Sequence, residues 1–262
     1  MFGKKKEPVL PREDGLTDYD IYIMGKQERI FNIVLAAVCL FGVGYVFYHS
    51  IILSLFVALL ALKFPEVRTN QIIAKRKRQL TLQFKDMLYS LASALSVGKS
   101  VETGIRDALQ DLRVVYPDPE TDILVEMEYI LRGLGMNNTV EAMFQQFAER
   151  AHLEDIDNFV DIFVTCKRTG GDLMEVMRST SNTIGEKIEV KQEIDTLISG
   201  KRYEFNFMMV LPVIMVLFLT LTSGDYMAPV FQTVVGRIAM TVAIAIFGLA
   251  YVVGSKVMKI TI

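Results

Sequence analysis

The sequence has few cysteines, a small net charge and no alternation of apolar and polar residues. Only Cys39 and Cys166 occur among 262 residues; we expect them in different compartments, without a disulfide, and their spacing fits no metal site. The formal net charge is −2, so the chain has no overall basic field, and we expect no nucleic-acid partner. No stretch alternates apolar and polar residues with period two, so no β-sheet is predicted.

Charged residues are missing altogether from long stretches of the sequence. Residues 31–62 and 205–222 contain no Asp, Glu, Lys or Arg. The whole chain is nevertheless 52% hydrophobic and 22% charged, so apolar and charged residues are separated along the sequence. This separation argues against an ordinary soluble domain. It predicts an all-α integral membrane protein with a polar block between two apolar parts.

The first apolar part predicts a membrane hairpin over 30–65. A single straight helix through it would be much longer than the ~30 Å hydrocarbon layer of a bilayer. Tyr48-His49-Ser50 is the polar spot near its middle, so we place a turn there. Pro65 is expected to end the second span. The two predicted spans are about 30–47 and 51–65.

The second apolar part predicts another pair of spans over 205–258. Pro212 lies inside the first of them and is expected to kink or distort the helix. Ser223-Gly224-Asp225 then breaks the helix, and a short semi-apolar link follows. With the first hairpin, this gives four transmembrane helices in two hairpins. The predicted spans of this pair are about 205–222 and 238–255.

The polar block, residues 66–204, has helical spacing almost throughout. Its apolar residues recur three and four positions apart, and glycines such as Gly98 separate the segments. Ser100 and Thr139 are placed to cap two of the helices. Stripes of this width predict one compact, six-helix antiparallel bundle. The helices are expected near 80–95, 101–112, 123–134, 140–147, 156–163 and from Asp172 onward.

A glycine pair, Gly170-Gly171, separates the last two helices of this block. Asp172 follows as a good N-cap, and Leu173 is the first apolar position of the next helix. No strong stop signal appears before the uncharged residues from 205. We therefore predict one long helix that begins polar and ends in the membrane. Residues 170–173 are interpreted as a structural joint, because paired glycines indicate backbone angles or close packing that a side chain would spoil.

Lysines and arginines are distributed unevenly and predict the orientation. The polar arm over 1–29 is rich in them, whereas the link before the last span has only Arg237. The positive-inside rule then makes both termini, including the tail 259–262, and the polar block cytoplasmic. Lys4-Lys5-Lys6 is followed by acids and prolines rather than by an apolar core. We expect a flexible or lightly structured arm and no signal peptide.

A basic quartet, Lys75-Arg76-Lys77-Arg78, begins ten residues after the first hairpin. Such a run can indicate nucleic-acid binding or nuclear import. With a membrane span just upstream, however, basic residues fix topology and contact anionic lipid. We therefore predict a juxtamembrane contact with lipid.

The tripeptide Gly98-Lys99-Ser100 is similar to the end of a phosphate-binding loop. Ser93 stands where that loop requires glycine, and the preceding segment is helical where a strand is required. A glycine that ends one helix, followed by a serine that caps the next, explains the same residues. Nucleotide binding is therefore not predicted.

His152 is followed by an acidic cluster that begins at Glu154 and includes Asp155. Such a cluster could hold a divalent cation, but it lacks the glycine and the ligand spacing of an EF-hand. Acids at a helix start are favoured by the helix dipole in any case. Since no catalytic set can be assembled either, we expect no enzymatic activity, no cofactor and no metal.

Four motifs, over about 40–262, together resemble a known family. The sequence is similar to the F-domain inner-membrane platform proteins of type II secretion systems and type IV pili, in particular the Tad pilus assembly branch, TadB and TadC. Larger members carry two F domains, whereas one is found here. The motifs are R-Q-L-T-L-Q-F-K-D-M-L-Y-S-L-A-S-A-L-S-V-G-K-S-V-E-T-G-I-R-D-A-L, K-R-T-G-G-D-L-M-E-V-M, E-I-D-T-L-I-S-G-K-R-Y-E-F-N-F-M-M-V-L-P and V-V-G-R-I-A-M-T-V-A-I-A-I-F-G-L-A-Y.

The resemblance implies a cell-membrane platform that couples a cytoplasmic hexameric secretion ATPase to the assembly of pilin subunits. The single F domain implies a second platform subunit as partner. The ATPase is expected to contact charged turns at the membrane-distal end of the bundle. The alternatives are a small-solute or lipid transporter, which needs a polar pathway through the spans, and a membrane-anchored enzyme, which needs a reactive constellation. The candidate contact residues are Arg113, Arg132, Lys167 and Arg168.

Overall fold

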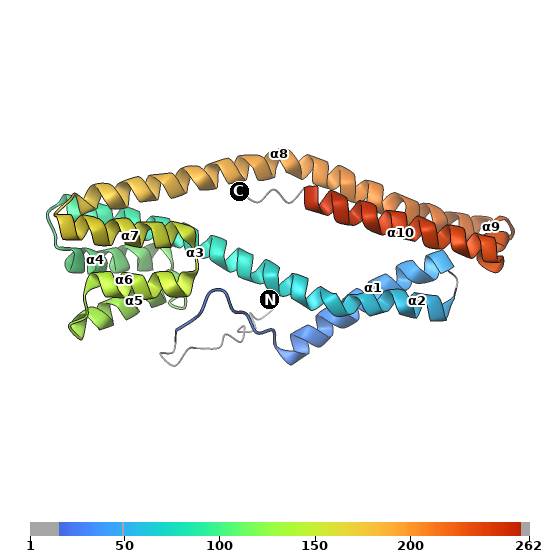
Figure 1. Cartoon of the computed structure of the whole chain (residues 1–262), viewed down its shortest axis with the longest axis horizontal. Coiled ribbons are helices and arrows are strands. Elements are labelled where there is room, and N and C mark those ends of the chain that lie inside the picture. Colours follow the sequence, from blue (N-terminus) through green and yellow to red (C-terminus); the bar gives the residue numbers. More distant parts are fainter. Residues whose placement is uncertain (1–15, 49, 258–262) are drawn as a thin grey trace. The chain divides into compact units, whose positions relative to one another are not determined.

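The computed structural model describes residues 16–48 and 50–257 of the chain, and these residues form helices and no strand (Figure 1). The predicted all-helical fold is therefore confirmed over this part of the chain. The predictions for Lys4-Lys5-Lys6, His49 and the tail 259–262 lie outside the described residues.

The described residues divide into two compact units. Unit 1 contains residues 16–25 and 68–189, and unit 2 contains residues 26–67, apart from 49, and 190–257. Two helices, α3 and α8, contribute residues to both units. The polar block of the sequence thus corresponds to most of unit 1, with its later boundary at 189 rather than 204.

Unit 1 is built around a core to which every helix of the unit contributes. Each apolar stripe predicted from the sequence contributes buried residues to it, while a few positions such as Leu95, Leu134 and Ile188 are only partly buried. Phenylalanines dominate the centre: the Phe84 and Phe159 rings lie 5.4 Å apart and those of Phe144 and Phe163 lie 5.1 Å apart, both edge to face. The helices are α3 (Phe64–Ser96), α4 (Val101–Val115), α5 (Asp122–Gly135), α6 (Val140–Ala151), α7 (Glu154–Thr169) and α8 (Leu173–Thr222).

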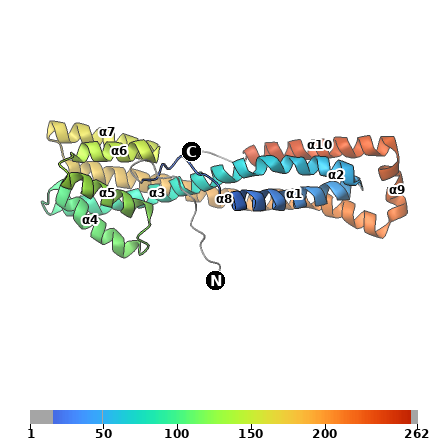
Figure 2. The same ribbon diagram turned by 90° about the horizontal axis from the view of Figure 1, so that it is seen from below.

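Cross-helix hydrogen bonds show that successive helices of unit 1 run antiparallel (Figure 2). For example, Tyr116 donates to Asp86 while Ser90, one turn further along α3, donates to Asp111. The same reversal relates α5 to α6 and α6 to α7. The turns at 97–100, 136–139 and 170–172 therefore share one end of the unit, here called the glycine end, and the turns at 116–121 and 152–153 share the other, the arm end.

The predicted caps of unit 1 are confirmed. The Ser100 hydroxyl accepts a hydrogen bond from the Thr103 amide, and Thr139 accepts one from Ala142 in the same way. Between α3 and α4, Gly98 has φ +80°, a left-handed conformation that glycine adopts without strain. These residues hold turns, as the sequence predicted, and the surrounding elements are helices.

Unit 2 begins with a helical hairpin. α1 (Lys26–Tyr48) ends and α2 (Ile51–Ala58) begins on either side of the position predicted for the turn. A 3₁₀ segment, η1 (Leu59–Lys63), leads directly into α3. Pro65 was expected to end the second span. η1 ends at Lys63, just before it, and Pro65 itself lies in the first turn of α3, where its missing N–H has no helical partner to lose.

The second part of unit 2 follows the predicted order with shifted boundaries. α8 continues through Pro212 to Thr222, α9 (Gly224–Gln232) follows the break at Ser223, and α10 (Val234–Val257) comes last. In the described part of the chain, three helices are long and apolar enough to cross a membrane: α1, α8 and α10. The four separate spans predicted are thus seen as three long helices and the short α2–η1 pair.

Candidate functional site

The arm of the chain, residues 16–25, lies on the arm end of unit 1 without forming a helix. Leu16, Tyr19 and Tyr22 are buried, with Tyr19 only 2% exposed. Of the predicted flexible or lightly structured arm, the second description fits these residues, which are held in place without forming a helix. The physical reason is that a large apolar side chain every third residue gives an extended segment enough surface to bury.

Beneath the arm, α5 and α6 contribute a buried ion pair. Glu126 and Arg150 are 1% and 2% exposed in their side chains, and the guanidinium donates to both carboxylate oxygens. Burial raises the pKa of Glu126, and the Arg150 guanidinium opposes that shift. A buried charge without its partner is costly, so this pair fixes how α5 and α6 face each other.

Tyr19 completes the pair from the arm. Its hydroxyl donates to Glu126 Oε1 at 3.2 Å, and its backbone N–H donates to the Arg150 carbonyl at 3.1 Å. The Arg76 guanidinium of α3 lies 5.0 Å from the centre of the Tyr19 ring, within cation–π range. Burial and the nearby Glu126 carboxylate raise the pKa of Tyr19 well above its usual value. This tyrosine therefore stays neutral and acts as a donor.

Two carboxylates flank Tyr19 and are held by basic groups at the edge of the site. Asp18 Oδ1 lies 3.2 Å from His152 Nε2, and Asp20 Oδ1 lies 2.7 Å from Lys77 Nζ. Lys77 also donates to the His152 carbonyl at 3.1 Å. The hydrogen bond from Lys77 lowers the pKa of Asp20. The backbone of the arm turns here, because the Asp20 amide donates to the Asp18 side chain.

These groups together are here called the arm socket: Arg76, Lys77, Glu126, Arg150 and His152. Every buried side-chain nitrogen or oxygen in the described part of the chain has a hydrogen-bond partner. The Glu126 carboxylate receives donors from both Arg150 and Tyr19. The socket is therefore arranged to hold a segment of chain.

The arm socket was not predicted from the sequence, although two signals were available. Glu126 falls on the apolar stripe of α5 with Ile123 and Ile130, and Arg150 falls on that of α6 with Met143 and Phe147. A charged residue at a stripe position of each of two neighbouring antiparallel helices indicates a buried pair. The partnership of Tyr19 with that pair gives no local signal, because it joins residues 107 positions apart.

The structure separates the basic quartet into two pairs. Arg76 and Lys77 turn toward protein carboxylates: Arg76 donates to both oxygens of Asp122, and Lys77 binds Asp20. Lys75 and Arg78 are exposed, as positions three apart on one helix face can be. The predicted lipid contact is thus left to Lys75 and Arg78, since the other two cations serve the arm end of unit 1.

The predicted joint between α7 and α8 has the backbone that its glycines indicated. Gly170 has φ +74°, and a side chain at Gly171 would place its Cβ 2.6 Å from Cys166 Sγ. The Asp172 carboxylate accepts a hydrogen bond from the Glu175 amide at 3.1 Å, so it caps α8 as predicted. Leu173 begins α8 and packs against the core.

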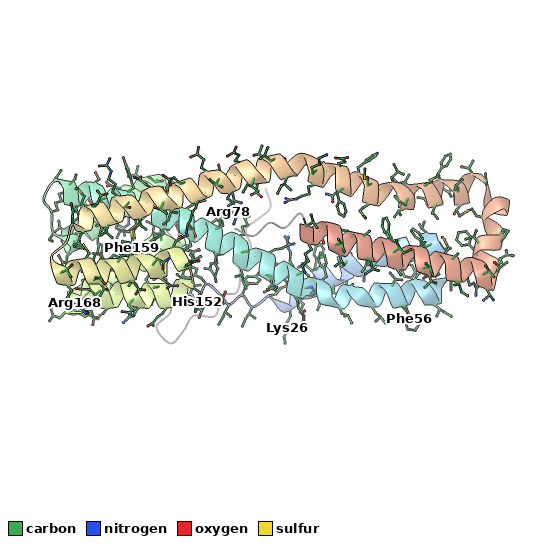
Figure 3. All side chains as sticks on the ribbon, turned by 45° about the horizontal axis from the view of Figure 1, so that its top comes forward. Lys26, Phe56, Arg78, His152, Phe159 and Arg168 are labelled. Atoms are coloured by element: carbon green, nitrogen blue, oxygen red, sulfur yellow. The ribbon has the colours of Figure 1, made fainter. Side chains whose placement is uncertain are left out.

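The four basic residues proposed for a partner do not share one end of unit 1. Arg132, Lys167 and Arg168 lie in the last turns of α5 and α7, at the glycine end. Arg113 lies in the last turn of α4 and binds Glu128, so it belongs near the arm end. The sequence-based grouping is corrected for Arg113, because alternate helices of an antiparallel bundle end at opposite ends. Figure 3 labels Arg168 and His152, which mark the two ends.

The acidic cluster after His152 serves as a helix start. Glu154, Asp155 and Asp157 lie in the first turn of α7, and Lys187 Nζ binds Asp155 and has a raised pKa because of that hydrogen bond. Among the described residues, no group of three His, Cys, Asp or Glu is placed to hold a metal ion.

A shallow groove of about 480 Å³ lies between α3 and α8 in unit 1. The Ser181 hydroxyl closes its floor by donating to the Lys85 carbonyl. Its lining is polar and open to solvent, and the arm socket is the more closely built of the two sites. The groove is lined by Lys85, Asp86, Tyr89, Ser181, Asn182, Gly185, Glu186 and Glu189.

Comparisons of the chain with protein-family models, with curated proteins and with solved structures found no match.

Proposed function

We propose that this chain is a membrane platform protein of a Tad-like type IV pilus or a related type II secretion machine. It would couple a cytoplasmic hexameric secretion ATPase to the assembly of pilin subunits in the membrane. The family resemblance of the sequence suggests this role. The observation that carries it is the continuity of α3 and α8, each of which contributes residues to a helical unit with a polar surface and to an apolar one.

Continuous helices suit such a role because a helix resists bending far better than a loop does. α8 has 50 residues in one helix, which corresponds to about 75 Å at 1.5 Å per residue. α3 enters unit 1 as a second helix without an intervening loop. A displacement of unit 1 caused by a bound ATPase would therefore reach the membrane segments through two helices.

The proposal includes four crossings of the cell membrane, with unit 1 as a cytoplasmic six-helix F domain and both termini cytoplasmic. α1, the apolar end of α8 and α10 are three of the crossings. The fourth is α2 with η1, about 22 Å long by the rise of its α and 3₁₀ turns, which is short for a ~30 Å layer. Local thinning of the bilayer would compensate.

The partners follow from the same proposal. They are the secretion ATPase, pilin subunits, membrane lipid and a second platform subunit, which completes a machine in which this chain supplies one F domain. Arg132, Lys167 and Arg168 at the glycine end are the basic residues proposed for the ATPase. Lys167 is held by Glu141 at 2.8 Å, which leaves Arg132 and Arg168 as the exposed cations of this group.

The test is a pull-down of the cognate ATPase by the full-length chain in detergent, at low and high salt. Complementary charge predicts binding that weakens as salt rises. Arg132→Glu and Arg168→Glu should each weaken it. Arg113→Glu is the control for the arm end: Arg113 is exposed like the other two, although it is paired with Glu128, and its reversal should leave binding unchanged.

Absence of binding at any salt would overturn the proposal, and so would ATP hydrolysis by the purified chain alone. If the Arg113 variant lost binding while the Arg132 and Arg168 variants kept it, the ATPase contact would lie near the arm end instead.

A further inference from the structure

We propose that the arm socket is a peptide-binding site for a tyrosine flanked by two carboxylates, and that the chain's own residues 16–25 occupy it as a detachable ligand. The proposal rests on the contacts between the arm and unit 1. It is independent of the secretion role, since it concerns binding within unit 1 alone.

The contacts are those of sequence-specific peptide recognition. Each residue of Asp18-Tyr19-Asp20 meets a different group: His152, the Glu126–Arg150 pair and Lys77. A backbone hydrogen bond from Tyr19 to the Arg150 carbonyl fixes the register of the segment. An aromatic anchor in a closed pocket, with charged contacts at its rim, is the arrangement by which short segments are bound selectively.

The arm can leave without dismantling the core beneath it. Tyr19 is the one described arm residue in the core cluster, whose other buried members come from α3 to α8, and Leu16 and Tyr22 are buried outside that cluster. The flanking contacts are partly exposed: the Asp20 and His152 side chains are 57% and 43% accessible, against 21% and 12% for their partners Lys77 and Asp18. Exposed pairs contribute little and are screened by salt. The arm is also non-helical, so it has the features of a segment that opens locally while the rest stays folded.

Docking of the arm has a consequence for the chain that follows it. Only residues 23–25 separate the buried Tyr22 from Lys26, the first residue of α1. A docked arm ties the entry of α1 to unit 1, and a released arm does not. The socket would thus control a third connection between the units, besides α3 and α8, and any segment that competes for the socket would release α1.

The first test adds a fluorescent peptide of residues 14–25 to the full-length Tyr19→Ala chain in detergent, whose own arm lacks the anchor. We expect saturable binding to this variant and at least tenfold weaker apparent binding to the unchanged chain, because a tethered arm competes at a high effective concentration. A peptide with Phe in place of Tyr19 should bind about tenfold more weakly, since it loses a hydrogen bond to a charged group.

Two variants of the quartet provide the matched control. Lys77→Glu in the Tyr19→Ala chain should weaken binding of the peptide about tenfold, because it replaces the attraction to Asp20 by repulsion and removes the hydrogen bond to the His152 carbonyl. Lys75→Glu, which makes the same charge change two residues away at an exposed position, should reduce binding less than threefold. Equal losses in the two variants would show general charge attraction and would overturn the proposal.

A second measurement uses the unchanged chain and covers the case in which Tyr19→Ala fails to fold. Hydrogen exchange of the Tyr19 amide should be at least tenfold faster than that of core amides in α5, and 1 M salt should accelerate it while leaving α5 unaffected. Exchange of Tyr19 at the rate of the α5 core, insensitive to salt, would show that the arm opens only with the whole unit. That result, or a folded Tyr19→Ala chain that binds no peptide, overturns the proposal.

Discussion

Gly170 and Gly171 stand side by side and are required for different physical reasons. At Gly170 there is room for a side chain, because no neighbouring atom lies within 4 Å of the position that a Cβ would take. Its φ of +74°, however, is unfavourable for any residue with a side chain. At Gly171 the conformation is ordinary and the space is missing, because Cys166 Sγ stands 2.6 Å from the absent Cβ. The sequence could indicate that a side chain would be harmful here, and the structure separates the two causes.

This separation predicts that one glycine substitution can be rescued and the other cannot. Gly171→Ala should destabilise unit 1 by about 1 kcal/mol, by forcing Cys166 into another position, and Cys166→Ala should restore most of that loss. Gly170→Ala should cost about 1–2 kcal/mol through its left-handed backbone, and Cys166→Ala should not help. Thermal unfolding of the full chain in detergent measures both differences.

Gly135→Ala is the control for these variants, since no neighbouring atom lies within 4 Å of its missing Cβ and its φ is not left-handed. It should leave stability unchanged or raise it slightly, because alanine favours the helix. Rescue of Gly170→Ala by Cys166→Ala would contradict the assignment of strain to the backbone at that position.

Helices were the elements that the sequence predicted best, and the reason is periodicity. The α4 stripe from Val101 to Leu112 is buried at each predicted apolar position, because a fixed spacing of three and four specifies which face is inside. Caps at Ser100 and Asp172 depend on contacts within three residues and were equally predictable. The arm socket was missed because it joins segments from distant parts of the sequence, and only folding brings Tyr19 to Glu126.

Pro65 shows where a local rule competes with its context. A proline after an apolar run is a common stop signal, yet it is also well suited to the first turn of a helix. Here the 3₁₀ segment Leu59–Lys63 ends just before it, and α3 starts at Phe64. The sequence is compatible with a helix that ends at Pro65 and with one that begins there. The conformation of the residues before the proline decides between the two.

At the scale of elements, the α1–α2 hairpin depends on one close approach. A side chain at Gly44 would bring its Cβ to 3.0 Å from the Cα of Ser54, which is backbone and cannot move cheaply. Ser54 is fully buried and donates to the Ser50 carbonyl at 2.8 Å. Small residues at such a contact allow apolar helices to pack where hydrophobic burial gives little drive between them.

We therefore predict that Gly44→Leu separates α1 from α2, at a cost of about 1–3 kcal/mol from overpacking. Gly42→Leu is the matched control, because Gly42 lies two residues away on the same helix with nothing within 4 Å of its missing Cβ. A cysteine pair placed across the hairpin should cross-link efficiently in the Gly42 variant and poorly in the Gly44 variant. Equal cross-linking in the two would show that the hairpin does not depend on this contact.

At the scale of the whole molecule, the central question is which segments face the cytoplasm. Lysines and arginines are abundant on unit 1, including the exposed Lys75 and Arg78, whereas the segment from Ser223 to Arg237 carries only that last arginine. Translocation of basic residues is disfavoured, so the charge distribution predicts an orientation of the chain. The three long apolar helices do not fix the orientation by themselves. If they were the only crossings, the two termini would lie on opposite sides of the membrane.

The resulting prediction concerns labelling of single cysteines in intact cells, in a chain with Cys39 and Cys166 replaced by serine. Ser223→Cys, between α8 and α9, should react with a membrane-impermeant maleimide from outside. Val97→Cys, at the glycine end of unit 1, and Lys256→Cys, near the end of α10, should react only after the cells are opened. All three positions are exposed, so burial within the chain does not limit the reaction.

If α2 with η1 did not cross the membrane, α3 would leave the membrane on the side of Ser50. Val97 would then lie on the opposite side of the membrane from the arm. Labelling of Ser223→Cys only in opened cells, or of Val97→Cys in intact cells, would therefore contradict the four-crossing arrangement.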